Sequence, residues 1–342
     1  MSSSVKAVRA YISIDLDNYV EGSMQILQLI RPEWKRENIK IKVFNDGISN
    51  KMLGFIHDTN VILIRINGNM TDMFTDRQSE IENFEILHGA GCGPMLHCIF
   101  DNGLCYDFIE GDTLSREDLR KPEIYNLITR EMVRFHKIQL KDSSSNQSPA
   151  VFKLCDKFLH LAFSDGAPPG KELVGYNGPK ETELRKEFST LREHLFELKS
   201  PIVYCHNDLL VNNIVFNNLK NSLHFIDFEY TGKNFQAFDI ANHFCEFAGV
   251  DNMDYSFYPD RHLQLDWIRT YLKHWNNSDI EVTDEDVEKL YVQVNKFALA
   301  ALFIWATWGL VQARYSNIDF DYINYTETRF REYFKKKKTL LL

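Results

Sequence analysis

The stretch IVYCHNDLLVNNIVFNNLKNSLHFIDFEY, residues 202–230, contains two apolar segments that each place an acidic residue at or near an end. The segments IVYC and LHFIDF have the composition of short strands. Asp208 follows the first segment, and Asp227 lies inside the second. An aspartate within such an apolar run loses hydration on folding, which costs free energy unless a cation or several donors compensate. We therefore expect a buried Asp227, with a bound metal as the compensating charge.

The polar residues after the first of these segments have an informative spacing. His206, Asp208 and Asn213 form the pattern H-x-D-x-x-x-x-N. This is the spacing of the catalytic loop of protein kinases, in which the aspartate faces a substrate hydroxyl and the asparagine holds Mg²⁺. Asp227 would then be the second metal-chelating residue. Either aspartate alone is more simply explained as the cap of a turn. The combination, with each residue beside an apolar strand, favours phosphoryl transfer.

The first hundred residues have the pattern of an antiparallel sheet that carries one helix. Three apolar segments, KIKVF, KMLGFIH and VILIRIN, are separated by NDGISN and DTN, whose residues are typical of turns. A helix follows, and GAGCGP ends it; Thr75 and Gln78 have the spacing of a capping box at its start. The segments MLHCIF and LCYDFI then flank residues 101–103 as a second hairpin.

Arg65 is the only charged residue in VILIRIN, and a guanidinium in an apolar strand needs an anionic partner. Glu80 shares a helical stripe with Phe84 and Leu87, so its carboxylate is expected to lean toward the core. These positions predict an Arg65–Glu80 pair, a counterpart of the Lys–Glu pair that orients nucleotide phosphates in kinases. Phosphate oxygens are the other candidate partner. The alternative is an edge-strand arginine that reaches solvent and a surface glutamate.

The second half of the chain is predicted to be mainly helical. Pro122 stands in the first turn of an amphipathic helix, and from Thr283 onward the pattern is that of long helices. The apolar run 297–311 is shorter than the roughly 20 residues that span a bilayer, so it is interpreted as a buried helix and not as an integral membrane segment. The run KKKK at 335–338 is expected to be a solvated tail.

The long helix from about residue 284 to residue 314 carries a stripe of apolar side chains. Trp305 and Trp308 lie on this stripe, one turn apart. Such a stripe usually packs in a core. Tryptophan faces also bind organic ammonium ions, however, and Tyr230 and Tyr325 offer further aromatic walls. A small cationic alcohol would fit among these rings.

At these residues the chain resembles the choline/ethanolamine kinase family, from about Val43 to Phe334. The segments CHNDLLVNNIVF, IDFEYTGKNFQAFDIANHFCEF and VNKFALAALFIWATW carry the resemblance. It implies an α+β, protein-kinase-like bilobal fold with ATP between the lobes. Residues 1–110 would form the nucleotide-binding lobe, an antiparallel sheet with one helix. Residues 111–342 would form the larger, mainly helical lobe for catalysis and amine binding.

The resemblance also implies roles for individual residues. The catalytic residues would be Asp208 as the base, Asn213 and Asp227, and the Mg²⁺ ligands would be Asn213, Asp227 and Glu229. The residues assigned to ATP are Asn45, Gly47, Ser49, Asn50 and Lys51 of a phosphate loop, Arg65, Glu80, the hinge residues Asp107, Phe108 and Ile109, and Leu210 and Asp227. The residues assigned to the amine substrate are Asp208, Tyr230, Trp305, Trp308 and Tyr325.

Within the family, the segments FNDGISNKMLGF, NGLCYDFIEG and YSNIDFDYINY are more similar to ethanolamine kinases than to choline kinases. This resemblance implies transfer of the ATP γ-phosphoryl group to the hydroxyl of ethanolamine, the first step of a route to phosphatidylethanolamine. A choline kinase and a non-catalytic nucleotide or amine sensor are the alternatives. The chain lacks a glycine-rich G-x-G-x-x-G loop and reads HND and DFE for HRD and DFG, which favours a small alcohol over a peptide.

The composition of the chain limits the kinds of partner and the cellular location that we expect. The chain has 342 residues, with 39 Lys and Arg against 48 Asp and Glu, so its net charge of -9 disfavours nucleic acid. The six cysteines form no C-x-x-C pair, which predicts reduced thiols and no structural metal. The charged N-terminal segment does not match a signal peptide, which predicts a cytoplasmic location. A homodimer is an alternative to a monomer that the sequence does not decide.

Overall fold

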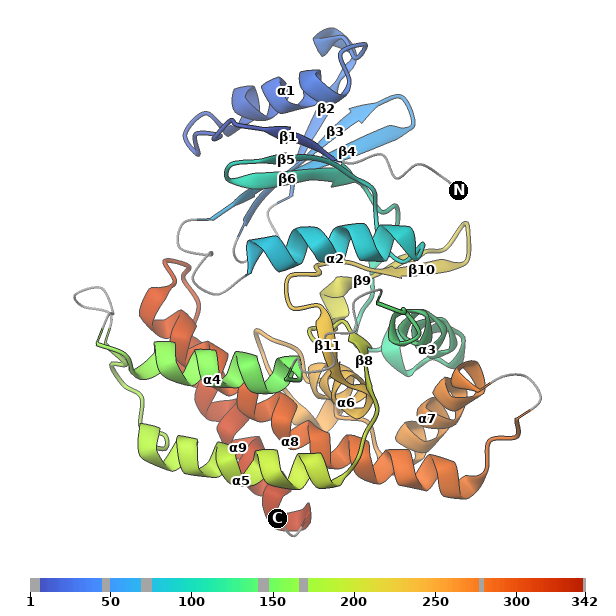
Figure 1. Cartoon of the computed structure of the whole chain (residues 1–342), viewed down its shortest axis with the longest axis vertical. Helices are drawn as coiled ribbons and strands as arrows, with labels where there is room; N and C mark the ends of the chain where they lie inside the picture. Colours follow the sequence, from blue (N-terminus) through green and yellow to red (C-terminus); the bar gives the residue numbers. More distant parts are fainter. Residues whose placement is uncertain are drawn as a thin grey trace. The chain divides into compact units, whose positions relative to one another are not determined.

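The structure, a computed structural model, describes residues 7–44, 50–68, 76–140, 148–165, 172–276 and 280–340. The chain divides into two compact units, Met1–Gly111 and Asp112–Leu342. Figure 1 shows a sheet with helices in unit 1 and a mostly helical unit 2. This arrangement agrees with the predicted α+β class, a sheet unit followed by a mainly helical unit.

Unit 1 is built on a six-stranded sheet. Its elements are β1 (Val8–Ala10), α1 (Tyr19–Ile30), the short 3₁₀ turn Arg36–Asn38, β2 (Lys40–Phe44), β3 (Asn50–His57), β4 (Asn60–Asn67), α2 (Arg77–Gly89), β5 (Leu96–Phe100) and β6 (Gly103–Asp107). The strand order is β1-β5-β6-β4-β3-β2. The predicted hairpins are present, but β1 pairs with β5 in parallel, so the sheet is mixed and not wholly antiparallel.

The sheet carries helices on both faces, whereas the sequence analysis expected one helix. Side chains alternate between the faces of a strand. On β4, Arg65 meets α2 on one face, and the alternate isoleucines pack with α1 in a core on the other. A strand buried on both faces has a nearly continuous apolar sequence, and VILIRIN fits this description. The residues shared by α1 and β4 in this core are Met24, Ile26, Leu27, Ile62, Ile64 and Ile66.

Helix α2 begins with a different cap from the one predicted. Asp76 is its N-cap, and the Asp76 Oδ1 accepts a hydrogen bond from the main-chain N–H of Ser79 at 3.2 Å. Gln78 instead donates to Glu82 at 3.0 Å. Thr75 lies outside the described residues. The prediction of a Thr75–Gln78 box is therefore wrong, because an aspartate carboxylate one residue further on serves as the acceptor.

Unit 2 is mainly helical, as predicted. Its elements are β7 (Asp112–Thr113), α3 (Pro122–His136), α4 (Ala150–Phe163), α5 (Glu181–Glu197), β8 (Ile202–Cys205), β9 (Ile214–Asn217), β10 (Ser222–Phe225), β11 (Gly232–Phe235), α6 (Gln236–Glu246), α7 (Arg261–Trp275), α8 (Asp284–Tyr315) and α9 (Tyr322–Leu340), with 3₁₀ turns at Asp118–Arg120, Val211–Asn213 and Tyr255–Phe257.

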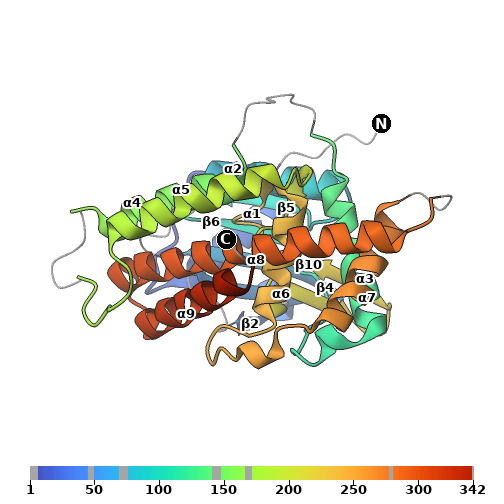
Figure 2. The ribbon, with the colours of Figure 1, turned by 90° about the horizontal axis from the view of Figure 1, so that it is seen from below.

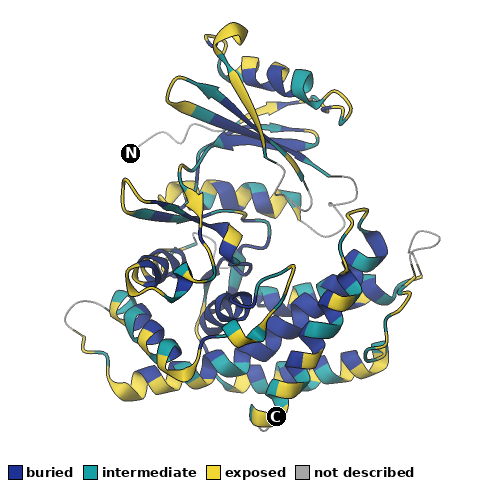
Figure 3. Ribbon diagram, turned by 180° about the vertical axis from the view of Figure 1, so that it is seen from behind, coloured by how far each residue is buried: buried dark blue, intermediate teal, exposed yellow. Residues whose placement is uncertain are grey.

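Helix α8 is the central helix of unit 2. It contacts α4, α6, α7 and α9, and Figure 2 shows it between these neighbours. All side chains from Phe297 to Thr307 are buried, and the buried centre of the unit is dark blue in Figure 3. By length and composition α8 resembles a membrane span, but 83% of its most apolar window is buried inside the structure. The prediction of a buried helix is confirmed.

The strands of unit 2 form two small sheets. Strand β8 pairs with β11, and β9 pairs with both β10 and β7. The sequence analysis identified the segments of β8 and β10 but not β7 and β11. The predicted strand LHFIDF ends early, at Phe225.

The run of lysines at 335–338 is not a solvated tail, and that prediction is wrong. It forms part of α9, where Lys337 pairs with Glu187 of α5 and Lys335 pairs with Glu332 at 3.1 Å. The Lys336 ammonium lies 3.4 Å from the centre of the Tyr258 ring. Carboxylates and an aromatic face therefore hold this charged segment against the unit.

Gly103 offers a test of the strand packing in unit 1. A Cβ there would lie 2.1 Å from the main-chain oxygen of Arg65 and 2.4 Å from the Phe100 ring. We expect Gly103→Ala to lower the free energy of unfolding by about 2–3 kcal/mol, because backbone and ring must move apart. Urea unfolding measures the loss.

Gly89→Ala is the matched control for this substitution. No atom lies within 4 Å of a Cβ at Gly89, which is the last residue of α2. Alanine should therefore leave the urea midpoint unchanged or raise it slightly. Equal midpoints for the two variants would contradict the close approach at Gly103.

Candidate active site

The loop between β8 and β9, residues 206–213, carries the H-x-D-x-x-x-x-N pattern, and we call it the catalytic loop after that pattern. It is held in place by hydrogen bonds to its backbone. The main-chain N–H groups of His206 and Asn207 donate to the carboxylate of Asp239, at 3.0 and 2.7 Å. Asn207 has a φ of 71° and donates through Nδ2 to the main-chain oxygen of Tyr230 at 2.8 Å. Asn213 donates through Nδ2 to the main-chain oxygen of Asp208, also at 2.8 Å. The backbone that carries Asp208 is thus fixed on both sides.

His206 is a structural member of this loop. Its Nε2 lies 2.9 Å from the main-chain oxygen of Ile226, and its Nδ1 lies 3.3 Å from the main-chain nitrogen of Asp208. Burial lowers the pKa of His206, so the ring is neutral near pH 7. A neutral ring with its proton on Nε2 donates to Ile226 and accepts from Asp208. His206 therefore joins the catalytic loop to the segment that contains Asp227.

Asp208 is buried, as the catalytic-loop pattern led us to expect. Burial raises the pKa of its carboxyl well above the usual value, and the carboxylates of Asp227, Glu246 and Glu229 raise it further. The Arg329 guanidinium opposes this effect. Excess negative charge therefore surrounds Asp208, and a cation at this place would favour its ionised form.

Asp227 is exposed, so the expectation of a buried carboxylate is wrong. The residue follows the end of β10, and its φ of 67° lies in the left-handed region. The alternation of the strand does not continue through such a residue, which explains why an aspartate in an apolar run reaches the surface. Its charge still acts on the pKa of Asp208, as does the charge of the partly exposed Glu229.

The oxygen atoms of Asn213, Asp227 and Glu229 suit a hard cation. Nδ2 of Asn213 is engaged with the main chain, which leaves Oδ1 as its coordinating atom. Mg²⁺ binds through one or two carboxylates and keeps several waters or phosphate oxygens as ligands. Among the described residues, His136, Cys205 and Asp239 are the only group of three such residues whose donor atoms all lie within 4.8 Å of one another. Asp208, Asp227 and Glu229 do not form a group this tight. The oxygen donors of Asn213, Asp227 and Glu229 are of the type that an open Mg²⁺ site uses, in which water or phosphate oxygens complete the coordination.

Asp239, on α6, is a residue that the sequence analysis missed. It is buried and accepts from the backbone of the catalytic loop, and its Oδ2 lies 3.0 Å from His136 Nε2. Burial acts to raise its pKa, but the His136 hydrogen bond and the other donors outweigh it, so the pKa lies below the usual value. An aspartate in the apolar run QAFDIANHFCEF is the same signal that singled out Asp227. That signal could have found Asp239.

The four aromatic residues predicted to bind an amine lie together, and we call Tyr230, Trp305, Trp308 and Tyr325 the aromatic group. Ring centroids are 5.2 Å apart for Tyr230 and Trp305, 6.0 Å for the two tryptophans, and 5.7 Å for Trp308 and Tyr325. The indole N–H of Trp308 donates to the Tyr230 hydroxyl at 3.2 Å. The predicted gathering of these side chains is present in the structure.

A buried ion pair lies next to the aromatic group, and sequence reasoning did not find it. Glu246 of α6 and Arg329 of α9 form two contacts of 2.9 and 3.1 Å, and each side chain is only 1% exposed. The Arg329 guanidinium also lies 4.6 Å from the centre of the Tyr325 ring. The pair thus fixes one face of Tyr325. The two residues are 83 positions apart, so no local pattern indicates their contact.

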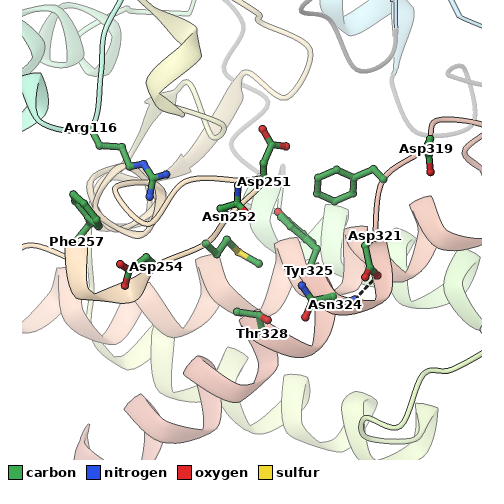
Figure 4. Close-up of a pocket in the computed structure, with 12 residues that line it drawn as sticks. Arg116, Asp251, Asn252, Asp254, Phe257, Asp319, Asp321, Asn324, Tyr325 and Thr328 are labelled. Atoms are coloured by element: carbon green, nitrogen blue, oxygen red, sulfur yellow. Dashed lines mark hydrogen bonds between the residues drawn. The ribbon is translucent and has the colours of Figure 1, made fainter.

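A cavity of about 710 Å³ in unit 2 adjoins the aromatic group, since Tyr325 lines it (Figure 4). Four aspartates and one arginine are among its lining residues. Arg116 already donates to the main-chain oxygen of Ala248 at 2.9 Å and lies 5.1 Å from the Phe257 ring centre. The wall is therefore predominantly acidic. The charged residues of the wall are Arg116, Asp251, Asp254, Asp319 and Asp321.

In unit 1 the predicted Arg65–Glu80 pair is present. Arg65 Nη2 lies 2.6 Å from Glu80 Oε1, and both side chains are buried. Arg77 adds a second contact to Glu80 at 3.1 Å. The prediction of an internal pair is confirmed, and the alternative of two surface side chains is wrong.

The other residues assigned to the nucleotide are placed as follows. Lys51 donates to the main-chain oxygen of Leu16 at 3.3 Å, and its neighbour Asn50 accepts from Gly68, also at 3.3 Å. Asp107 contacts His97 at 2.6 Å. Phe108 and Ile109 follow β6 at its end, and Leu210 lies in the catalytic loop. Asn45, Gly47 and Ser49 lie outside the described residues.

These features define the chain as a phosphotransferase of the protein-kinase-like class, with an aromatic group beside its catalytic loop. The sequence model of the family described as choline/ethanolamine kinase matches residues 41–334. The chain is 42% identical to ethanolamine kinase 2 of Homo sapiens, over 95% of this chain and 83% of that protein. The chain therefore belongs to the choline/ethanolamine kinase family, and the resemblance stated from the sequence is confirmed.

Solved structures agree with this assignment. A Plasmodium vivax ethanolamine kinase is 26% identical and superposes with a TM-score of 0.81, over 93% of this chain and 89% of that one. A choline kinase from Cryptosporidium parvum gives a TM-score of 0.76 at 24% identity, over 93% of this chain and 96% of that one. This second likeness shows the fold.

The role of Asp239 can be tested by removing its charge. Asp239→Asn should lower the free energy of unfolding at pH 7 by about 3 kcal/mol, because charged hydrogen bonds to buried backbone are lost. The pKa of Asp239 lies below its usual 3.8, so its stabilisation is complete above that pH and is lost as the pH falls through the lower folded value. Urea titrations at a series of pH values measure the difference between wild type and variant. That difference should shrink at the acid end, and a constant difference would contradict this role.

Proposed function

We propose that the chain catalyses the ATP-dependent phosphorylation of ethanolamine on its hydroxyl oxygen. One observation carries the proposal: unit 2 brings Asp208 and the aromatic group together. Burial is the main cause of the raised pKa values of Tyr230 and Tyr325, and the charge of Asp208 contributes to both. A base for a hydroxyl and a set of rings for an ammonium ion thus lie in one place. The similarity to proteins named ethanolamine kinase supports the same function.

Asp208 acts as the base in the proposed reaction. The substrate oxygen attacks the γ-phosphorus, the bond from this phosphorus to the bridging oxygen breaks, and ADP leaves with that electron pair. The hydroxyl proton passes to the carboxylate of Asp208. Such a base contributes about 10²- to 10⁴-fold in rate. The hydrogen bonds from Asn213 and to Asp239 hold its backbone while this occurs.

Asn213, Asp227 and Glu229 are proposed to hold Mg²⁺. When bound, the ion offsets the charge of the ATP phosphates and of the carboxylates around Asp208. For the nucleotide we propose the residues that the family resemblance assigns to it. The residues are the catalytic-loop Leu210 with Asp227, the Arg65–Glu80 pair, the segment of Asn45, Gly47, Ser49, Asn50 and Lys51, and the segment of Asp107, Phe108 and Ile109.

The chemistry of the aromatic group fits an ammonium ion, and the acidic cavity beside it suits a cation. Aromatic faces bind quaternary and primary ammonium ions alike, but a primary ammonium also needs hydrogen-bond acceptors. Asp208 and the Tyr230 hydroxyl are acceptors at the aromatic group. We therefore place ethanolamine first and choline second. All six cysteines are buried thiols, which suits a reducing compartment and supports a cytoplasmic location.

An assay of ADP release with ethanolamine and choline side by side tests the function. We expect release that depends on an amine and is faster, at low concentration, with ethanolamine. Faster release with choline would identify a choline kinase, and binding of ATP without amine-dependent release would identify a sensor.

Asp208→Ala should abolish ethanolamine-dependent ADP release, because the base is lost, while ATP binding measured by calorimetry persists. The control is Asp156→Ala, which removes an exposed carboxylate on α4 that pairs only loosely with Arg192, at 3.6 Å. Its turnover should match that of the wild type. An Asp208→Ala enzyme with near-normal turnover would refute the role of the base.

Trp308→Leu should raise the KM for ethanolamine about 10-fold and leave the KM for ATP unchanged, because the leucine cannot provide the cation–π contact. Trp308 is partly exposed, so this change disturbs the core less than a change at Trp305. Trp34→Leu, a tryptophan of unit 1 outside the proposed site, is the control. If the two KM values rise together, the aromatic group is not the amine site.

A further inference from the structure

A buried chain of hydrogen bonds leads away from the catalytic loop, and the proposed reaction has used only its last member, Asp239. Gln236 Nε2 lies 2.9 Å from the Tyr271 hydroxyl, and this hydroxyl lies 2.7 Å from His136 Nδ1. His136 Nε2 lies 3.0 Å from the carboxylate of Asp239. All four side chains are at most 5% exposed. We call these four residues the buried chain.

The donors and acceptors of the buried chain run in one direction. The Gln236 amide can only donate to the Tyr271 oxygen, which leaves the Tyr271 O–H to donate to His136 Nδ1. His136 then carries its proton on Nε2 and donates to Asp239. Asp239 in turn accepts the backbone N–H groups of His206 and Asn207. Each contact of the buried chain then has one donor and one acceptor, and the directions agree from Gln236 to Asp239.

The chain connects three helices to the loop. His136 is the last residue of α3, Tyr271 is in α7, and Gln236 and Asp239 are in α6. The Tyr271 ring also stacks on Trp267 with an interplanar angle of 7°, so the position of its hydroxyl is fixed. The position of the loop that carries Asp208 is therefore fixed by helices α3, α6 and α7 as well as by the strands on either side of it.

His136, Cys205 and Asp239 could also be read as a buried metal site, because their donor atoms lie within 4.8 Å of one another. The hydrogen bonds favour the other explanation. Both nitrogens of His136 and both oxygens of Asp239 have partners within the protein. The Cys205 thiol lies 3.6 Å from the main-chain oxygens of Asn234 and Phe235, and burial raises its pKa well above the usual value, so it stays protonated.

We propose that His136, supported by Tyr271, is a positioning residue for the phosphoryl transfer. It fixes the carboxylate of Asp239, which fixes the backbone of His206 and Asn207 and thereby the direction of the Asp208 side chain. This inference rests on the proposed function. A base displaced by about 1 Å can cost about 100-fold in rate without weakening substrate binding. The role should therefore appear in kcat and not in KM.

Two substitutions at His136 separate its two nitrogens. The amide of His136→Gln can reach the place of Nε2 and donate to Asp239, whereas the amide of His136→Asn reaches only the place of Nδ1. We expect His136→Asn to lower kcat about 100-fold and His136→Gln to recover most of this loss, with the KM for ATP and for ethanolamine within about 3-fold of wild type. Equal kcat values for the two variants would overturn the proposal.

Tyr271→Phe removes only the hydroxyl and should lower kcat about 5-fold. Its matched control is Tyr333→Phe, which removes the hydroxyl of another fully buried tyrosine, bonded to Glu187 away from the loop. The control should keep the kcat of the wild type. If the His136 variants do not fold, this pair decides: equal kcat values for Tyr271→Phe and Tyr333→Phe overturn the proposal.

Amide hydrogen exchange of the segment 203–209 provides a readout that does not depend on turnover. Exchange should be faster in His136→Asn than in His136→Gln, and unchanged exchange in both would overturn the proposal. If the wild type shows no ethanolamine-dependent ADP release, the proposed function fails, and the exchange comparison still tests the positioning. One equivalent of tightly bound metal in the wild type that is lost in His136→Asn would assign the group to metal binding and overturn the proposal.

Discussion

A charged carboxylate buried in a protein needs hydrogen-bond donors. The structure of unit 2 depends on the donors that the carboxylate of Asp239 has. Two of its donors are backbone N–H groups of the catalytic loop, and the third is His136. Because the aspartate cannot be left unpaired without a large free-energy cost, its need for donors fixes the loop. The conformation of Asp208 therefore follows from the hydrogen bonds that a different buried carboxylate, Asp239 of α6, accepts.

Around Asp208 the balance of charge is the reverse of that around Asp239. Its neighbours Asp227, Glu246 and Glu229 are acidic and raise its pKa, and Arg329 opposes them. Arg329 is already paired with Glu246. The net charge left by these residues is negative, and both species in the proposed reaction that would approach it, a divalent metal ion and an ammonium group, are positive. The same excess of negative charge can therefore attract both the metal ion and the ammonium group.

Local patterns were sufficient where the chemistry lies in one segment. The H-x-D-x-x-x-x-N spacing, the Arg65–Glu80 pair and the tryptophan stripe of α8 could all be predicted, because each is a charge or ring in an unusual local setting. The exposure of Asp227 could not, since it depends on the sign of one backbone angle. The Glu246–Arg329 pair could not either, because burial of a charge predicts that a partner exists but does not say which residue it is.

The amine-binding rings proposed here are also part of the core. Trp305 lies within a run of buried side chains on α8, the helix against which α4, α6, α7 and α9 pack. The same side chains would therefore determine both the selectivity for the amine and the stability of the fold. Directed evolution toward a bulkier amino alcohol would have to begin from a thermostabilised parent, because each enlargement of the pocket removes packing from the centre of the unit.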